Sequence, residues 1–124
     1  MIEIERFEEI LNELAEELPV EFFKHLNGGI LVLPEAKDSE HTSELCVMGE
    51  YITSPSMGRY IKIYYGSFAR VYGELEEFEL KSKMRGVLRH EFRHHMERLG
   101  GTDELGKEDQ RFINSFLRQR NKNA

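Results

Sequence analysis

Apolar residues recur every three or four positions in the first part of the chain, with glutamates between them. This period is typical of an amphipathic α-helix, and Pro19 marks its end because proline has no amide hydrogen to donate inside a helix. A further helical turn is predicted at residues 21–26, before the Asn27-Gly28-Gly29 segment breaks it. The positions that define the apolar stripe of the first helix are Ile4, Phe7, Ile10, Leu11, Leu14 and Leu18.

Three short segments in the middle of the chain have the composition of β-strands. Residues 30–33 are all aliphatic and are followed by proline. Residues 45–52 and 60–65 are rich in β-branched and aromatic side chains, and residues 54–58 between them supply turn chemistry. The pattern predicts three strands, with the last two joined as a hairpin, and a polar loop at residues 35–43.

Helical spacing returns in the second half of the chain. We predict a short helix at residues 67–72 and a long one at about 75–99, where Gly100-Gly101 stops it. A last helix begins near Lys107. The predicted order is a helix, a small sheet of about three strands and then two or three helices, which is an α+β fold in a single domain over residues 1–124. The buried stripe of the long helix is expected to contain Leu80, Met84, Val87, Leu88, Phe92 and Leu99.

Composition narrows the class of protein. The 124 residues are 40% hydrophobic, which is enough for one modest core. No run of about 18 apolar residues exists, so no membrane span is expected, and the acidic N-terminus lacks the features of a secretory signal. The one cysteine, Cys46, cannot form an internal disulfide. These features lead us to expect a cytoplasmic protein.

Charge is distributed unevenly along the chain. The net charge is −6, but residues 1–50 hold 13 acidic and 3 basic side chains, whereas residues 51–124 hold 10 acidic and 14 basic ones. Binding to nucleic acid requires many phosphate contacts from lysine and arginine, so the overall acidic balance argues against it. The sequence therefore favours a function that does not involve nucleic acid.

The chemistry of the chain is concentrated in the segment His90-Glu91-Phe92-Arg93-His94-His95. Two histidines four residues apart on a helix lie on the same face, one turn above the other, so both imidazoles can reach one ion. Glu91 lies about 100° around the helix axis from His90, where its carboxylate can act as a general base. Imidazole ligands favour zinc over magnesium. The alternative is a solvated helix face with ordinary i,i+4 pairs.

A catalytic zinc site usually has a third protein ligand besides a water molecule. No histidine or cysteine follows the Gly100-Gly101 break, so this ligand is expected to be a carboxylate. Spacing alone does not choose among the acidic residues there, but the first turn of the last helix would hold a ligand more rigidly than the loop would. The candidates are Asp103, Glu104, Glu108 and Asp109.

These motifs resemble the small, single-domain bacterial zincin-like metallopeptidases, which have a minimal zincin fold of the gluzincin type. The resemblance extends from the first helix to the start of the last one, and the doubled histidine that ends the metal motif is characteristic of the family. It includes Leu18-Pro19-x-Glu21-Phe22, Gly49-Glu50-Tyr51, Arg59-Tyr60-Ile61-x-Ile63-Tyr64-Tyr65 and His90-Glu91-x-x-His94-His95.

The resemblance implies a zinc cofactor, a peptide or protein substrate and a third metal ligand at the start of the last helix. The family has an aspartate there, and alignment on that helix places Asp109 at its position. Alignment on the first acidic residue after the glycines would place Asp103 there instead, because residues 96–107 make a longer connection than the family has. In such folds an edge strand beside the metal helix binds extended peptide, and the strand at residues 59–65 is a candidate for this role, with Tyr60, Tyr64 and Tyr65 beside the cleft. The alternative, which the composition favours, is ordinary cross-strand aromatic packing of these tyrosines.

Two functional hypotheses follow for the histidine pair. In the first, the protein is a zinc-dependent hydrolase, most simply a metallopeptidase, in which Glu91 takes a proton from the metal-bound water. In the second, it is a non-catalytic metal-binding or interaction module that keeps the fold. The neighbouring His95 points away from the metal face and is expected to pack in the core or to bond the backbone. The stripe of Lys81, Arg85, Arg89 and Arg93 is expected to be a solvated face, unless an arginine pairs with a substrate carboxylate.

Overall fold

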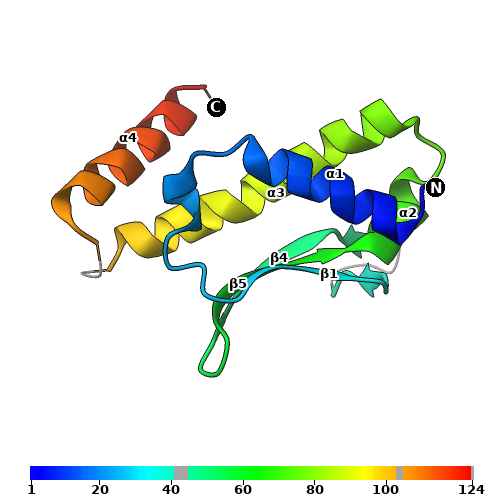
Figure 1. The fold of residues 1–124 in the computed structure, drawn as a ribbon, viewed down its shortest axis with the longest axis horizontal. Coiled ribbons are helices and arrows are strands. Elements are labelled where there is room, and N and C mark those ends of the chain that lie inside the picture. Colours follow the sequence, from blue (N-terminus) through cyan, green and yellow to red (C-terminus); the bar gives the residue numbers. More distant parts are fainter. Residues whose placement is uncertain (41–44, 103–104, 124) are drawn as a thin grey trace.

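The computed structural model describes residues 1–40, 45–102 and 105–123, with side chains as far as residue 118. The helices lie on one face of a small sheet, so the domain has two layers (Figure 1). The helices are α1 (Ile4–Glu16), the 3₁₀ turn η1 (Val20–Phe23), α2 (Tyr65–Tyr72), α3 (Glu77–Gly100) and α4 (Lys107–Asn123). The strands are β1 (Gly29–Leu33), β2 (Lys37–Asp38), β3 (Cys46–Val47), β4 (Gly49–Ser54) and β5 (Gly58–Tyr64).

The main sheet has the strand order β1-β5-β4. β1 runs parallel to β5, and β4 pairs with β5 as the predicted antiparallel hairpin. Gly58 permits the hairpin turn, since its φ of +74° is one that L side chains rarely adopt. The predicted α+β order of one helix, a three-stranded sheet with a hairpin, a long helix and a C-terminal helix is confirmed.

Two local predictions are corrected. The predicted strand at residues 45–52 is divided, because Cys46–Val47 pairs with Lys37–Asp38 in a separate ladder while Gly49 begins β4. Part of the loop predicted at residues 35–43 is therefore strand β2, and residues 41–44 lie outside the described part of the chain. The short helix predicted at 67–72 begins two residues earlier, at Tyr65.

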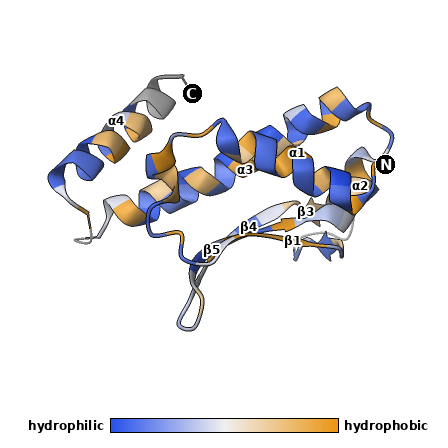
Figure 2. Ribbon diagram, in the orientation of Figure 1, coloured by the Kyte–Doolittle hydropathy of each residue, from blue (hydrophilic) through white to orange (hydrophobic). Residues whose placement is uncertain are grey.

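The core lies between the helices and the sheet. Alternate residues of β5, Ile61 and Ile63, face this layer and are at most 1% exposed. From α3, Phe92 lies against both Phe22 and Phe23, with ring centroids 5.9 and 5.0 Å apart. Figure 2 shows the resulting alternation of hydrophobic and hydrophilic residues along α1 and α3. None of the described helices is long and apolar enough to cross a membrane.

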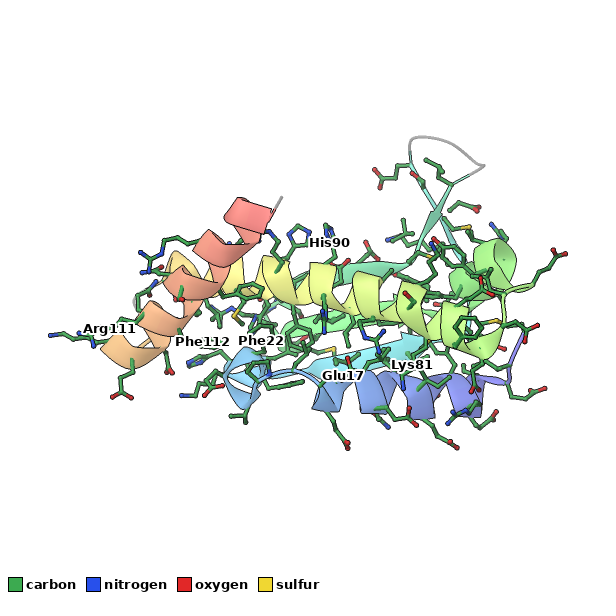
Figure 3. All side chains as sticks on the ribbon, turned by 90° about the horizontal axis from the view of Figure 1, so that it is seen from above. Glu17, Phe22, Lys81, His90, Arg111 and Phe112 are labelled. Atoms are coloured by element: carbon green, nitrogen blue, oxygen red, sulfur yellow. The ribbon has the colours of Figure 1, made fainter. Side chains whose placement is uncertain are left out.

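Three residues of the basic stripe of α3, Lys81, Arg85 and Arg89, face acidic residues at the end of α1 instead of open solvent, whereas Arg93 pairs with Glu97 within α3. Lys81 pairs with Glu13 at 2.8 Å, and Arg85 pairs with Glu17 at 2.9 Å; Figure 3 shows Glu17 and Lys81 where the two helices run side by side. These ion pairs lower the pKa of both carboxyl groups. Each pair is partly exposed and therefore contributes little to stability by itself.

Candidate metal centre

His90 and His94 lie on the side of α3 away from α1, and Figure 3 shows His90 pointing outward from the helix. Both histidines are exposed, and their Nε2 atoms are 3.1 Å apart. The two rings are nearly perpendicular, at 85°, with centroids 4.6 Å apart. One helical turn thus brings two imidazole nitrogens together, as the spacing of the motif predicts.

The separation of these nitrogens fits two corners of a tetrahedral zinc site. Two Zn–N bonds of ~2.0–2.1 Å at the tetrahedral angle would place the nitrogens ~3.3–3.4 Å apart. The observed 3.1 Å is within a few tenths of an ångström of this value. Small rotations of the two imidazole rings are sufficient to reach it. The donor set and its spacing are therefore suitable for zinc.

Glu91 lies beside the histidine pair but is buried. Its side chain is 6% exposed, and it lines the same cleft as His90 and His94. Burial raises the pKa of the Glu91 carboxyl group; His94 opposes this and the charge of Glu50 adds to it. A carboxylate with a raised pKa is a better proton acceptor near neutral pH than an exposed one. The environment of Glu91 therefore suits a general base.

The cleft of about 680 Å³ lies between α3 and the edge strand β4. Gly49 allows the two elements to approach closely, since a Cβ there would be 3.0 Å from Val87 and 3.3 Å from the Cγ of Glu91. The lining residues are Gly49, Glu50, Tyr51 and Thr53 from β4, and His90, Glu91, His94, Glu97 and Arg98 from α3.

The structure supports packing of the three tyrosines within the fold and not a place in the lining of the cleft. The strand that carries Tyr60 and Tyr64 is the centre of the sheet, with β1 on one side and β4 on the other. Tyr60 and Tyr64 are buried, and Tyr65 begins α2, where its hydroxyl donates to the carbonyl of Ile2. The edge strand beside the histidines is β4. Both strands of a hairpin have similar residue composition, so composition did not distinguish edge from centre.

Glu50 is a cleft residue that sequence reasoning did not single out. Lys37 donates to both carboxylate oxygens, at 2.8 and 2.9 Å, and the hydroxyl of Tyr64 donates at 2.5 Å. Burial opposes the charge of Glu50, but these two donors outweigh it, so the pKa of Glu50 is lowered. A fixed negative charge therefore stands close to Glu91. In the sequence, Glu50 was noticed only as part of the Gly49-Glu50-Tyr51 segment of the family resemblance, and that segment did not indicate a role for its carboxylate.

The structure does not bring Asp109 to the histidine pair. Lys24 donates to both oxygens of Asp109, at 2.9 and 3.0 Å, and this ion pair joins the end of η1 to α4. Glu108 lies beside it in the first turn of α4, while Asp103 and Glu104 lie outside the described residues. Among the residues with described side chains, no group of three or more His, Cys, Asp or Glu is arranged to hold a metal ion.

His95 is buried and holds three parts of the fold together. It is 0% exposed, its Nε2 lies 2.8 Å from the carbonyl oxygen of Lys24, and its Nδ1 lies 2.7 Å from the hydroxyl of Tyr51. Since a carbonyl only accepts, Nε2 carries the proton and Nδ1 accepts from Tyr51. The prediction that His95 packs in the core and bonds the backbone is confirmed. Through Tyr51 it also fixes the cleft strand against α3.

This arrangement predicts an acid-sensitive contribution from His95. Burial lowers the pKa of His95 below its ordinary value of 6.5, despite the bond to Lys24. Below pH 6.5 the unfolded chain therefore binds a proton that the folded chain resists, and stability is lost as the pH falls. Denaturant unfolding of metal-free protein from pH 7.5 to 5 measures this. We expect a shallower pH dependence in His95→Asn than in wild type; equal slopes in the two proteins would contradict the assignment.

Comparisons with known proteins support the fold. No protein-family model matches the chain, and no curated protein sequence does. A solved structure of a conserved hypothetical protein, TTHA0227 from Thermus thermophilus, matches with a TM-score of 0.70 and 36% sequence identity. The match covers 82% of this chain and 100% of that one. This chain belongs to the same family. The resemblance to minimal zincin-like proteins is thereby supported for the fold, and the description of the family member states no activity.

Proposed function

We propose that this protein is a zinc-dependent hydrolase that cleaves peptide bonds. The observation that carries the proposal is the convergence of the Nε2 atoms of His90 and His94, 3.1 Å apart, on a cleft that also contains buried Glu91. When bound, a zinc ion supplies Lewis acidity, which makes water a stronger acid and polarises a carbonyl group. Two imidazoles and a neighbouring base are among the protein groups that such chemistry uses.

Four residues of the cleft have a role in this reaction. His90 and His94 hold the ion through Nε2. The carboxylate of Glu91 accepts a proton from the attacking water, because its raised pKa makes it a better proton acceptor. It then gives this proton to the amine of the leaving group. Glu50 keeps its charge and supports the raised pKa of Glu91.

The shape of the cleft suits an extended peptide. β4 is an edge strand with no neighbour on the cleft side among the described strands, so it can pair with substrate backbone. The hydrogen bond between the side chains of Tyr51 and His95 fixes the position of this strand against α3. Gly49 keeps the peptide path close to Glu91, because a larger residue would separate the strand from the helix.

A second candidate function is a metal-binding module without hydrolytic activity. It is favoured by one observation: no third metal-binding side chain accompanies the histidine pair among the described residues. Incubating zinc-loaded protein with a peptide library and identifying products by mass spectrometry distinguishes the two. The hydrolase proposal expects products that disappear with a chelator and return with added zinc. Tight zinc binding with no product from any peptide would support the module.

The third ligand has its own test. If Asp109 binds the metal, its carboxylate must leave the ion pair with Lys24. Asp109→Ala should then weaken zinc binding by more than about tenfold, whereas Lys24→Ala should leave the zinc affinity unchanged or make it tighter. Zinc affinity is measured by competition with a chelator. If the two substitutions change stability alike and leave zinc affinity alone, Asp109 serves only the ion pair that holds α4. Glu108→Ala provides the matched control on the same turn.

A further inference from the structure

The edge of the sheet farthest from the histidine pair is formed by β1. Strand β5 separates it from β4, and no other described strand pairs with its outer side. An edge strand presents alternate backbone N–H and C=O groups to whatever lies beside it, and proteins usually blunt such edges with charges or proline. β1 has neither: it reads Gly29–Leu33 with four aliphatic residues, each half-buried, and is coloured as hydrophobic in Figure 2.

A groove runs between this strand and α1. It has a volume of about 330 Å³ and is lined by Glu8, Leu11 and Asn12 of α1 and by Ile30, Leu31, Val32 and Leu33 of β1. A second hollow on the same side of α1 shares Asn12 with it and extends to Glu16 and to Val20, which is 75% exposed. The two hollows, which share Asn12, are together called the α1–β1 groove.

The carboxylates along this groove differ from those on the other side of α1. Glu13 and Glu17 pair with basic residues of α3. Glu8 and Glu16 are exposed, line the groove, and form no ion pair with any residue whose side chain the structure describes. The groove therefore combines an apolar floor with an uncompensated negative rim. A second copy of this chain would bring like charges together, whereas a basic segment would neutralise them.

We propose that the α1–β1 groove binds an extended basic segment of a partner protein, which adds a strand to the outer edge of β1. Ile30 and Val32 pack toward the helix layer, so side chains of the added strand that point the same way pass beneath α1 and meet Glu8. The alternate side chains lie beside Leu31 and Leu33 on the other face. A segment of alternating basic and aliphatic residues fits both faces. This site is independent of the proposed hydrolase, since β5 separates it from the cleft.

The test uses a fluorescein-labelled peptide of eight residues in which lysine and valine alternate. Its binding to the full chain is followed by fluorescence anisotropy, and amide hydrogen exchange of residues 29–33 is followed by NMR. The groove variant carries Glu8→Lys and Glu16→Lys. The control carries Glu74→Lys and Glu79→Lys, which change the net charge equally at exposed positions away from the groove.

We expect saturable binding, slower exchange of backbone amides in β1 on binding, and a Kd about tenfold higher in the groove variant but close to wild type in the control. Equal weakening in both variants would overturn the proposal, since it would mean that the peptide responds only to net charge. Absence of binding would also overturn it. So would sedimentation showing a wild-type dimer that the groove variant dissociates, because the occupant would then be a second copy.

Discussion

Glu91→Gln is expected to lower the rate of peptide hydrolysis by about 10²- to 10⁴-fold while zinc remains bound. This range is the contribution of a general base, and the amide of glutamine has the shape of the carboxylate without its capacity to accept the proton. The histidine ligands are unchanged, so zinc affinity should stay near that of wild type. The measurement is kcat/KM on a peptide found by the library screen, with zinc content determined on the same samples.

The matched control is Glu97→Gln, because Glu97 lines the same cleft but is exposed and pairs with Arg93 at 3.0 Å. It should retain a rate close to wild type. The folded state of Glu91→Gln can be checked independently. Burial raises the pKa of Glu91, so its charge opposes folding above that pKa, and the glutamine variant should be at least as stable at neutral pH. Full hydrolysis by a folded Glu91→Gln variant would show that Glu91 is not the base.

Phe92→Ala is expected to reduce the free energy of unfolding by about 3–5 kcal/mol. Phe92 is 0% exposed and its ring lies against Phe22 and Phe23, so truncation removes apolar contacts and leaves a cavity where α3 and η1 meet. Such a loss is a large part of the ~5–15 kcal/mol that stabilises an ordinary domain. Denaturant unfolding followed by circular dichroism measures it.

Phe78→Ala gives the comparison on the same helix, since Phe78 is 74% exposed. Its effect should lie within about 0.5 kcal/mol of zero. A loss below about 1 kcal/mol for Phe92→Ala would mean that the core does not pack around this ring as described.

The helices and the histidine motif were predictable because their signals are local. The apolar period around Leu80, Met84 and Leu88 places one face of α3 in the core, and the spacing of His90 and His94 then sets their nitrogens on the other face. The burial of His95 follows from the same rotation of the helix. Each of these inferences needs only the geometry of one element.

The strand order and the place of Asp109 depended on parts of the chain that are far apart in the sequence. β1 pairs with β5 across the whole hairpin, so nothing in either strand's composition showed that β5 is central and β4 is the edge. Likewise, the position of Asp109 depends on how the connection after Gly101 directs α4, and its ion pair with Lys24 joins residues 85 positions apart. Resemblance to the family suggested a ligand there, but the longer connection makes the spacing a weak guide.

The pairing of charges on α1 was also beyond the reach of the sequence. The glutamates of this helix are alike in the printed chain, yet Glu13 and Glu17 neutralise α3 while Glu8 and Glu16 line a groove. The packing of Phe7, Ile10 and Leu14 determines which glutamates of α1 face α3. The period of these apolar residues predicts that one face of α1 is buried, but it does not predict which element covers that face. The glutamates of α1 therefore form two distinct surfaces, one paired with α3 and one along the groove.

The central claim is that His90 and His94 hold a metal ion. It is tested most directly by titrating metal-free protein with zinc in competition with a chromophoric chelator, for wild type, His90→Ala, His94→Ala and the control His25→Ala. We expect a single zinc ion per wild-type chain, affinity weakened by more than about a hundredfold in each variant of the pair, and little change in the control. Wild-type protein that binds no zinc, or variants of the pair that bind it as tightly as wild type, would contradict the claim.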